Sequence, residues 1–261
     1  ITTQFSAQTL KSTLPDLRFP VVSMLIMFGL SVIAFHGFKV HPQRRGLFEA
    51  MFANSNTVFV GLPVNEALFG PKSMPFVLVY YMANTTFFWT LGAYLIQRDG
   101  QGTATFNLVT TLKKIFSPPL LGFMLGVALV LLDIQLPSWI MKDFSYVGGL
   151  TVPLSMIFIG TAIAGAGVQN IRLNRDSLGI LFGRFLVAPT LMACLVIPTP
   201  MPILMKQVFI LQAAMPVMTN APVVAKLYHA DTDYAAIMVT ETTLLSLVVI
   251  PILMVIVQQI H

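Results

Sequence analysis

Two stretches of the chain place small polar residues, glycine and proline inside otherwise apolar sequence. The first reads FANSNTVFVGLPVNEALFG and the second LQAAMPVMTNAPVVAKLYHA. Proline removes an amide donor and crowds the preceding helical turn, and glycine loosens the same backbone. These stretches predict two helices that are interrupted in the middle. The residues that could form a site in them are Asn54, Asn56, Gly61, Pro63, Pro216, Thr219, Asn220 and Pro222.

The chemistry open to a pair of interrupted helices is the binding of a small ion. A half-helix exposes unpaired amide donors at its N-terminus and unpaired carbonyl oxygens at its C-terminus. Converging donors, helped by Asn and Thr side chains, favour a small anion such as a carboxylate, whereas carbonyl oxygens alone would favour a cation. The plainer alternative is that the prolines only kink packed helices.

Three further polar residues lie deep in apolar sequence. Asn84 could line the site, or it could form an interhelical hydrogen bond. Arg184 and Glu241 enter their apolar segments from the same side, so they could form a structural buried pair or an ion-coupling site.

The elements that must position these residues are membrane-spanning helices. Hydrophobic residues make up 56% of the 261 residues, charged residues only 10%, and the mean hydropathy is +0.81. A soluble domain carries about 25% charged residues. Runs of about 20 apolar residues match the hydrocarbon thickness of a bilayer. The sequence therefore predicts an all-α polytopic membrane protein, with helices over roughly 19–38, 47–69, 74–96, 119–132, 146–164, 178–197, 207–228 and 234–257.

Positions 159 residues apart match across three consecutive segments. Pro63-Val64 aligns with Pro222-Val223, and 19–38 and 74–96 align with later segments at the same offset. Segments 119–132 and 146–164 have no partner, so we expect inverted five-helix repeats over 1–116 and 117–261, with the first two helices of the first repeat missing. Two breaks at equivalent repeat positions favour a binding site over simple kinks.

The charges set the expected orientation and exclude other classes of protein. Basic residues flank the apolar segments and are more numerous in the loops after 19–38, 74–96 and 146–164, so we expect that side to be cytoplasmic and the C-terminus outside. No basic stretch is interleaved with aromatics, so no nucleic acid is expected as a partner. The single Cys194 and the scattered histidines suggest no metal site, and no nucleotide or hydrolase motif is present. We expect no cofactor and no enzyme activity.

The stretch NSNTVFVGLPVNEALFGPKSMPFVLVYYMANTTFFWTLG resembles the first broken helix and following helix of the auxin efflux carrier family. The stretches GGLTVPLSMIFIGTAIAG and QAAMPVMTNAPVVAKLYHADTDYAAIMVTETTLLSLVVIP are similar to its later motifs. This family includes plant PIN proteins and bacterial malate and malonate permeases. The resemblance implies a transport domain, here in 19–97 and 177–258, that moves against a scaffold, here 118–165, through which a homodimer would form.

We therefore predict a secondary transporter with the lipid bilayer as its environment, in the bacterial plasma membrane. Its substrate would be a small organic anion, either a dicarboxylate like malate or malonate or an auxin-like carboxylate, moved by alternating access. The alternative is a membrane sensor or regulatory subunit that binds a ligand without transporting it.

Overall fold

The computed structural model describes residues 13–101, 118–132, 134–151 and 174–260, with short pieces between 153 and 161. Every regular element in these parts of the chain is a helix, and the only β contact there is one isolated bridge. Helices at Leu14–Phe38, Arg175–Val196 and Thr232–Val257 are long and apolar enough to cross a membrane. The predicted all-α polytopic fold is confirmed.

The first half of the chain forms a long helix, a broken helix and a second long helix. A 3-10 turn, η1 (Leu14–Leu17), leads into α2 (Arg18–Phe38), and η2 (Pro42–Arg44) leads into the broken pair α3 (Arg45–Ala53) and α4 (Gly61–Phe69). After η3 (Pro71–Ser73), the helix α5 (Met74–Phe87) continues through a π-helical turn, η4 (Phe88–Gly92), into α6 (Ala93–Gln101).

The second half repeats this order. The first long helix consists of α11 (Arg175–Phe182), a π-helical turn η6 (Gly183–Val187) and α12 (Ala188–Val196). The broken pair is α13 (Ile203–Ala213) and α14 (Asn220–Leu227), and the last long helix is α15 (Thr232–Val257). The order long, broken, long thus occurs twice, as the sequence repeat predicts.

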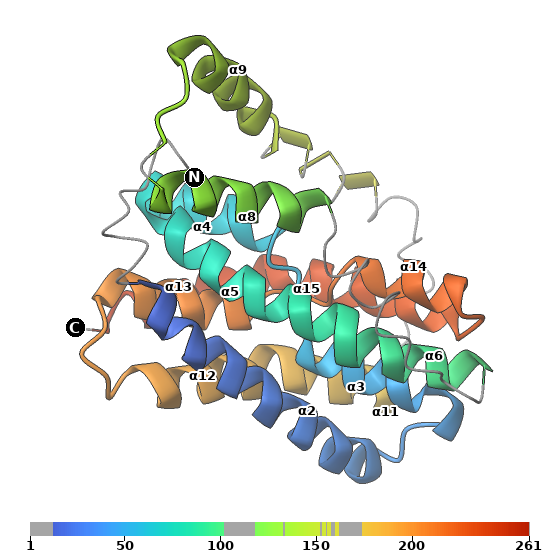
Figure 1. Cartoon of the computed structure of the whole chain (residues 1–261). Coiled ribbons are helices and arrows are strands. Elements are labelled where there is room, and N and C mark those ends of the chain that lie inside the picture. Colours follow the sequence, from blue (N-terminus) through green and yellow to red (C-terminus); the bar gives the residue numbers. More distant parts are fainter. Residues whose placement is uncertain are drawn as a thin grey trace.

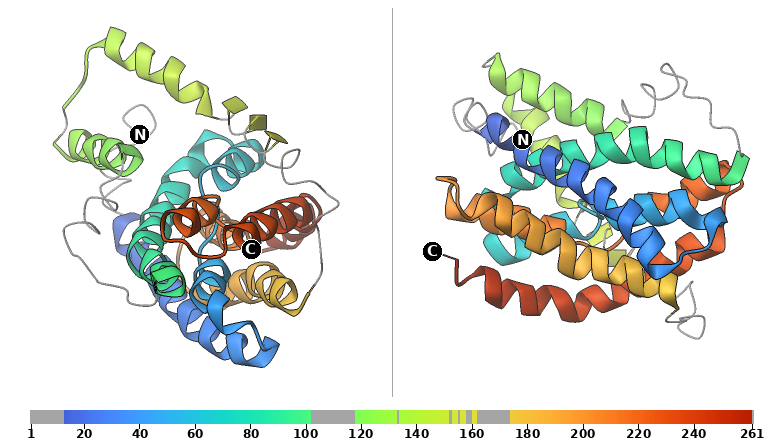
Figure 2. Two further views of the ribbon diagram at one scale, coloured as in Figure 1. Left: turned by 90° about the vertical axis from the view of Figure 1, so that its right-hand side faces the viewer. Right: turned by 90° about the horizontal axis from the view of Figure 1, so that it is seen from below.

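Two further helices, α8 (Pro118–Leu131) and α9 (Ser138–Gly149), lie to one side of the bundle that the other helices form (Figure 1, Figure 2). Large apolar side chains on α9, including Trp139 and Phe144, are exposed, as on helices that face lipid. The predicted 146–164 helix begins inside α9, which starts at Ser138 and ends at Gly149; Leu150 is in a turn, and the described residues from 151 to 161 are helical again. Lys142 and Asp143 interrupt the apolar run, but they lie on an amphipathic helix that an apolar-run criterion does not find. The end of the 146–164 segment and most of the 98–117 connector lie outside the described residues.

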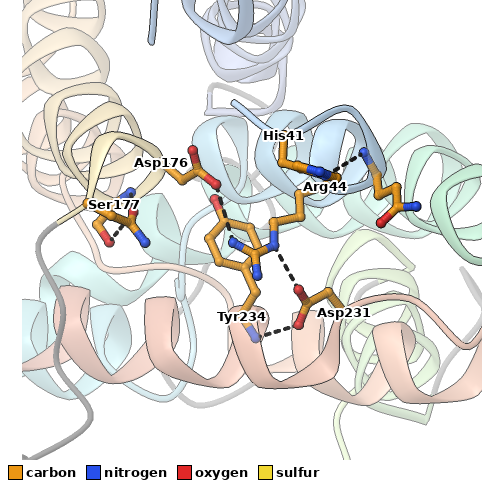
Figure 3. A network of polar contacts seen from close by, with 8 residues as sticks. His41, Arg44, Asp176, Ser177, Asp231 and Tyr234 are labelled. Carbon is orange, nitrogen blue, oxygen red and sulfur yellow. Dashed lines mark hydrogen bonds and ion pairs between the residues drawn. The ribbon is translucent and has the colours of Figure 1, made fainter. Parts of the chain in front are cut away.

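One end of the bundle is tied together by charged residues that precede or follow the helices. The Arg44 guanidinium donates to Asp231, at 2.7 Å, and to Asp176, at 3.4 Å, and it lies 4.7 Å from the centre of the Tyr234 ring. Figure 3 shows Arg44 between the two carboxylates, which belong to the starts of α11 and α15. Through Arg44, the first residues of α3, α11 and α15 are therefore held next to one another at the same end of the bundle.

The same end of the bundle holds a second carboxylate contact. The Asp99 side chain accepts the backbone N–H groups of Gly46 and Leu47, both at 2.8 Å. These donors lie in the first turn of α3, where no intrahelical acceptor exists and negative charge is favoured. Burial nevertheless raises the pKa of Asp99 to about 6, against the lowering effect of the two N–H groups.

Candidate functional site

The two interrupted helices are broken over 54–60 and 214–219. Pro63 and Pro222 are each the third residue of the second half-helix, α4 or α14. Proline is tolerated in the first turn of a helix because its missing N–H would have no partner there, but its ring does not allow the helix to continue backwards. The local sequence thus determines where each second half-helix begins.

The two breaks lie against each other. Ser55 forms an antiparallel bridge with Val217, and the backbone N–H of Asn56 donates to the carbonyl oxygen of Pro216 at 2.8 Å. Antiparallel pairing is the relation expected of two equivalent segments in an inverted repeat. The prediction that the two unwound segments meet is confirmed.

The unwound backbone is satisfied by side chains from the helices that follow each broken pair. On α5, the Asn84 amide donates to the Ser55 carbonyl oxygen at 2.8 Å and accepts the Ser55 N–H at 2.9 Å. On α15, the Thr242 hydroxyl accepts the Val217 N–H at 3.1 Å. Buried backbone groups require such partners, so Asn84 forms the interhelical hydrogen bonds that the sequence left as one of two roles.

Arg184, on the π-helical turn η6, lies directly behind the breaks and is fully buried. Its guanidinium donates to the carbonyl oxygens of Phe52, Ala53, Ala213 and Met215. Glu241 is buried on α15. The pairing of Arg184 with Glu241 stays a prediction, while the structure assigns the arginine a set of backbone partners that the sequence did not suggest.

A cavity of about 280 Å³ opens beside the crossing of the two breaks. Three predicted site residues, Asn56, Thr219 and Asn220, line it. The other predicted residues are not among the lining residues: Asn54, Gly61, Pro63, Asn84, Pro216 and Pro222 shape or support the breaks instead. The cavity is lined by Ser55, Asn56, Thr57, Val58, Phe59, Tyr81, Thr85, Trp89, Met218, Thr219 and Asn220.

Asn56 lines this cavity and carries a buried amide donor. Its side chain is 2% exposed, its Oδ1 accepts the Phe59 N–H at 3.1 Å, and its Nδ2 has no hydrogen-bond partner among the described residues. A buried amide donor without a partner is costly. A ligand oxygen within hydrogen-bond distance of this Nδ2 would remove that cost.

The aromatic and hydroxyl residues on α5 and η4 that line the cavity were not predicted from the sequence. Tyr81, Thr85 and Trp89 are spaced by four residues and so lie on one face of a helix. The signal that could have identified them is this spacing, since Asn84 already marked the neighbouring face as one that contacts the breaks.

The close crossing of the two halves depends on Gly61 at the start of α4. A side-chain carbon at this position would lie 2.3 Å from the Gln212 Oε1 on α13, and Gln212 is fully buried. Gly61, predicted as a site residue, therefore serves to let the second helix approach.

Comparison with known proteins agrees with this architecture. A family model described as "Membrane transport protein" matches residues 1–254. The chain is 27% identical over 247 residues to an uncharacterized transporter of Methanocaldococcus jannaschii, covering 90% of this chain and 77% of that protein. It is 29% identical over 246 residues to an uncharacterized transporter of Methanothermobacter thermautotrophicus, covering 89% and 76%. The predicted relationship is confirmed: the chain belongs to the auxin efflux carrier-like family of membrane transport proteins and is an integral membrane transporter.

Proposed function

We propose that the protein moves a small organic anion across the membrane by alternating access, and that the cavity beside the crossing breaks binds the anion's carboxylate. The observation that carries this proposal is the buried Asn56 amide, which lines the cavity beside the two breaks and whose Nδ2 has no hydrogen-bond partner among the described residues. Neutral donors at half-helix ends are the usual means by which broken-helix transporters hold a carboxylate.

The lining residues favour one carboxylate group on an otherwise apolar molecule. None of the described lining residues is charged, and Phe59, Tyr81 and Trp89 supply aromatic surface. A second carboxylate would lose its hydration without gaining a cationic partner, which is costly in a low-dielectric site. Between the two predicted substrate classes, an auxin-like monocarboxylate therefore fits this cavity better than malate or malonate.

The alternating movement would carry the breaks, with the helices around them, past the scaffold helices α8 and α9. The position of α8 and α9 to one side of the bundle supports this division (Figure 2). The location in a bacterial plasma membrane and a homodimer formed through the scaffold stay predictions, and the two relatives described above are archaeal.

A counterflow assay with the full-length protein in liposomes tests the proposal. Liposomes loaded with unlabelled indole-3-acetate or malonate are diluted into a trace of the same labelled acid. We expect transient accumulation of label that saturates with concentration and is stronger for indole-3-acetate. Saturable binding without exchange would instead identify the sensor, and the lack of both for either acid would exclude these carboxylates as ligands.

A further inference from the structure

Arg184 is the largest fully buried side chain in the described part of the protein. Its Nη1 donates to the carbonyl oxygens of Phe52, at 3.2 Å, and Ala53, at 2.9 Å. Its Nε and Nη2 donate to the carbonyl oxygen of Met215, at 3.2 and 3.0 Å, and Nη2 also donates to that of Ala213. The five bonds match the five N–H groups of a guanidinium.

Three of these four carbonyl groups come from corresponding places in the two halves of the chain. Phe52 and Ala53 are the last residues of α3, and Ala213 is the last residue of α13, while Met215 lies two residues further on, in the second break. The final carbonyls of a helix have no intrahelical partner, and the dipole places partial negative charge there. Two such ends meeting inside a membrane need a cation between them, and Arg184 provides one that is covalently attached.

The helix that carries Arg184 is built to reach this position. The residue lies in the π-helical turn η6, an arrangement that often marks functional positions. Next to it, a side-chain carbon at Gly183 would lie 2.3 Å from the Phe52 ring. Only glycine therefore allows this helix to come close enough to α3 for the guanidinium to reach its last carbonyls.

We propose that Arg184 is a positioning residue for the anion site: a tethered cation that joins the C-terminal ends of α3 and α13 and thereby holds both breaks in the geometry that forms the cavity. It acts through the backbone. Residues 54–60 follow directly on the Phe52 and Ala53 carbonyls that it binds, and residues 214–219 follow Ala213 and include Met215. Five of the cavity-lining residues lie in the first of these breaks. The consequence for the substrate rests on the proposed function, whereas the joining of the two breaks does not.

The first test measures hydrogen exchange in the purified full chain without any ligand. In the unaltered protein, segments 54–60 and 214–219 should open as one unit with the same free energy. Arg184→Lys keeps the charge but offers three donors instead of five. We expect it to raise exchange in both breaks together by about tenfold or more, with little change in α2 and α15.

A matched control is available in Lys206. This buried cation also donates to a carbonyl at the end of a helix, since its Nζ lies 3.0 Å from the oxygen of Ile197, the C-cap of α12, but it does not line the cavity. Lys206→Gln should leave exchange in both breaks unchanged. Faster exchange in only one break of Arg184→Lys, or equal effects of the two substitutions, would overturn the proposal. If Arg184→Lys does not fold, different opening free energies of the two breaks in the unaltered protein would overturn it equally.

The second test asks whether the effect reaches the substrate. With labelled indole-3-acetate, Arg184→Lys should raise the KM for counterflow about tenfold while changing the maximal rate less. In Arg184→Ala, millimolar guanidinium should restore both the protection of the breaks from hydrogen exchange and the affinity for indole-3-acetate, because the free cation can bind the same carbonyl oxygens. If guanidinium restores the protection but the protein binds no indole-3-acetate, the joining of the two breaks by Arg184 would be supported and the carboxylate would be rejected as the substrate. An unchanged KM in Arg184→Lys would reject the positioning role.

Discussion

At the scale of single residues, the unwound backbone is held by a small number of side chains with separate tasks. Asn84 and Thr242 satisfy the unpaired peptide groups of the breaks, and Arg184 donates to the carbonyls of Ala53 and Ala213 at the ends of the first half-helices. Asn56 differs from these, because its Nδ2 has no hydrogen-bond partner among the described residues. The residues that support the breaks are therefore different from the residue that we propose as the contact for the substrate.

Removing the Asn56 donor should weaken substrate binding without disturbing the fold. A hydrogen bond to a charged group contributes about 1.5–3 kcal/mol, so Asn56→Ala should lower carboxylate affinity roughly tenfold to a hundredfold. The affinity is measured by titrating labelled acid against purified protein. Asn65→Ala is the control: Asn65 is also buried, but its amide donates to the Gly61 carbonyl oxygen and does not line the cavity. Equal losses of affinity in both variants would contradict a direct contact.

Asp99, beyond the end of its predicted span, gives the protein a specific pH dependence. Its pKa is raised to about 6 in the folded state and is about 3.9 in an unfolded chain. The folded state therefore binds the proton more tightly, so the stabilisation is complete below pH 4 and is lost as the pH rises through 6. The thermal midpoint of the unaltered protein should decrease as the pH is raised from about 5 to about 7.5. Asp99→Asn should remove part of this decrease. Asp143→Asn, on the exposed face of α9, is the control, and parallel curves for Asp99→Asn and the unaltered protein would show that Asp99 does not titrate here.

At the scale of elements, the site is made by how closely the half-helices of the two repeats approach. Gly61 on α4 faces the Gln212 side chain on α13 with no room for a methyl group. Gly183 does the same for η6 against the ring of Phe52 on α3. Such contacts determine the crossing geometry more strictly than the hydrophobic pattern does, since the interior is close-packed.

Gly61→Ala should destabilise the crossing and reduce transport. Overpacking a buried contact costs about 1–3 kcal/mol, and the displaced Gln212 would also lose its hydrogen bond to the Thr57 carbonyl oxygen. The thermal midpoint in detergent and the counterflow rate should both fall. Adding Gln212→Ala should recover most of the loss by making room for the methyl group. Gly29→Ala on α2, where the added carbon would meet nothing within 4 Å, should be neutral; failure of the double substitution to recover stability would reject this contact as the cause.

At the scale of the whole molecule, the two ends of the bundle differ in charge. The end that carries Arg44, Asp176 and Asp231 is tied by ion pairs (Figure 3) and belongs to the side richer in basic residues, which we expect to face the cytoplasm. Lys72 lies at the opposite end, between α4 and α5.

Labelling of single cysteines tests this orientation. In a Cys194→Ser background, a cysteine introduced by Lys72→Cys should react with a membrane-impermeant maleimide on intact cells. A cysteine introduced by Gln43→Cys should react only after the membrane is opened. Both positions are exposed, so accessibility within the protein does not limit either reaction. The reverse pattern would invert the assigned topology.

The sequence alone determined the class of protein, the two breaks and their repetition. These features depend on local chemistry: apolar runs match a bilayer, and Pro63 and Pro222 stop a helix whatever surrounds them. The order of elements and the meeting of the breaks followed from the repeat. The start of α9 was not predicted from the sequence, because this amphipathic helix contains charged residues and no long apolar run.

Only the tertiary structure decided which polar residues support the breaks and which line the cavity. Asn54 and Asn56 are two residues apart and alike in type, yet the Asn54 amide donates to the Asn84 carbonyl oxygen, while Asn56 lines the cavity with an Nδ2 that has no partner among the described residues. Arg184 is 131 residues away from Ala53, whose carbonyl it binds. Such assignments depend on distances between segments far apart in the chain, and these distances are set by packing at contacts such as Gly61 and Gly183 rather than by any local pattern.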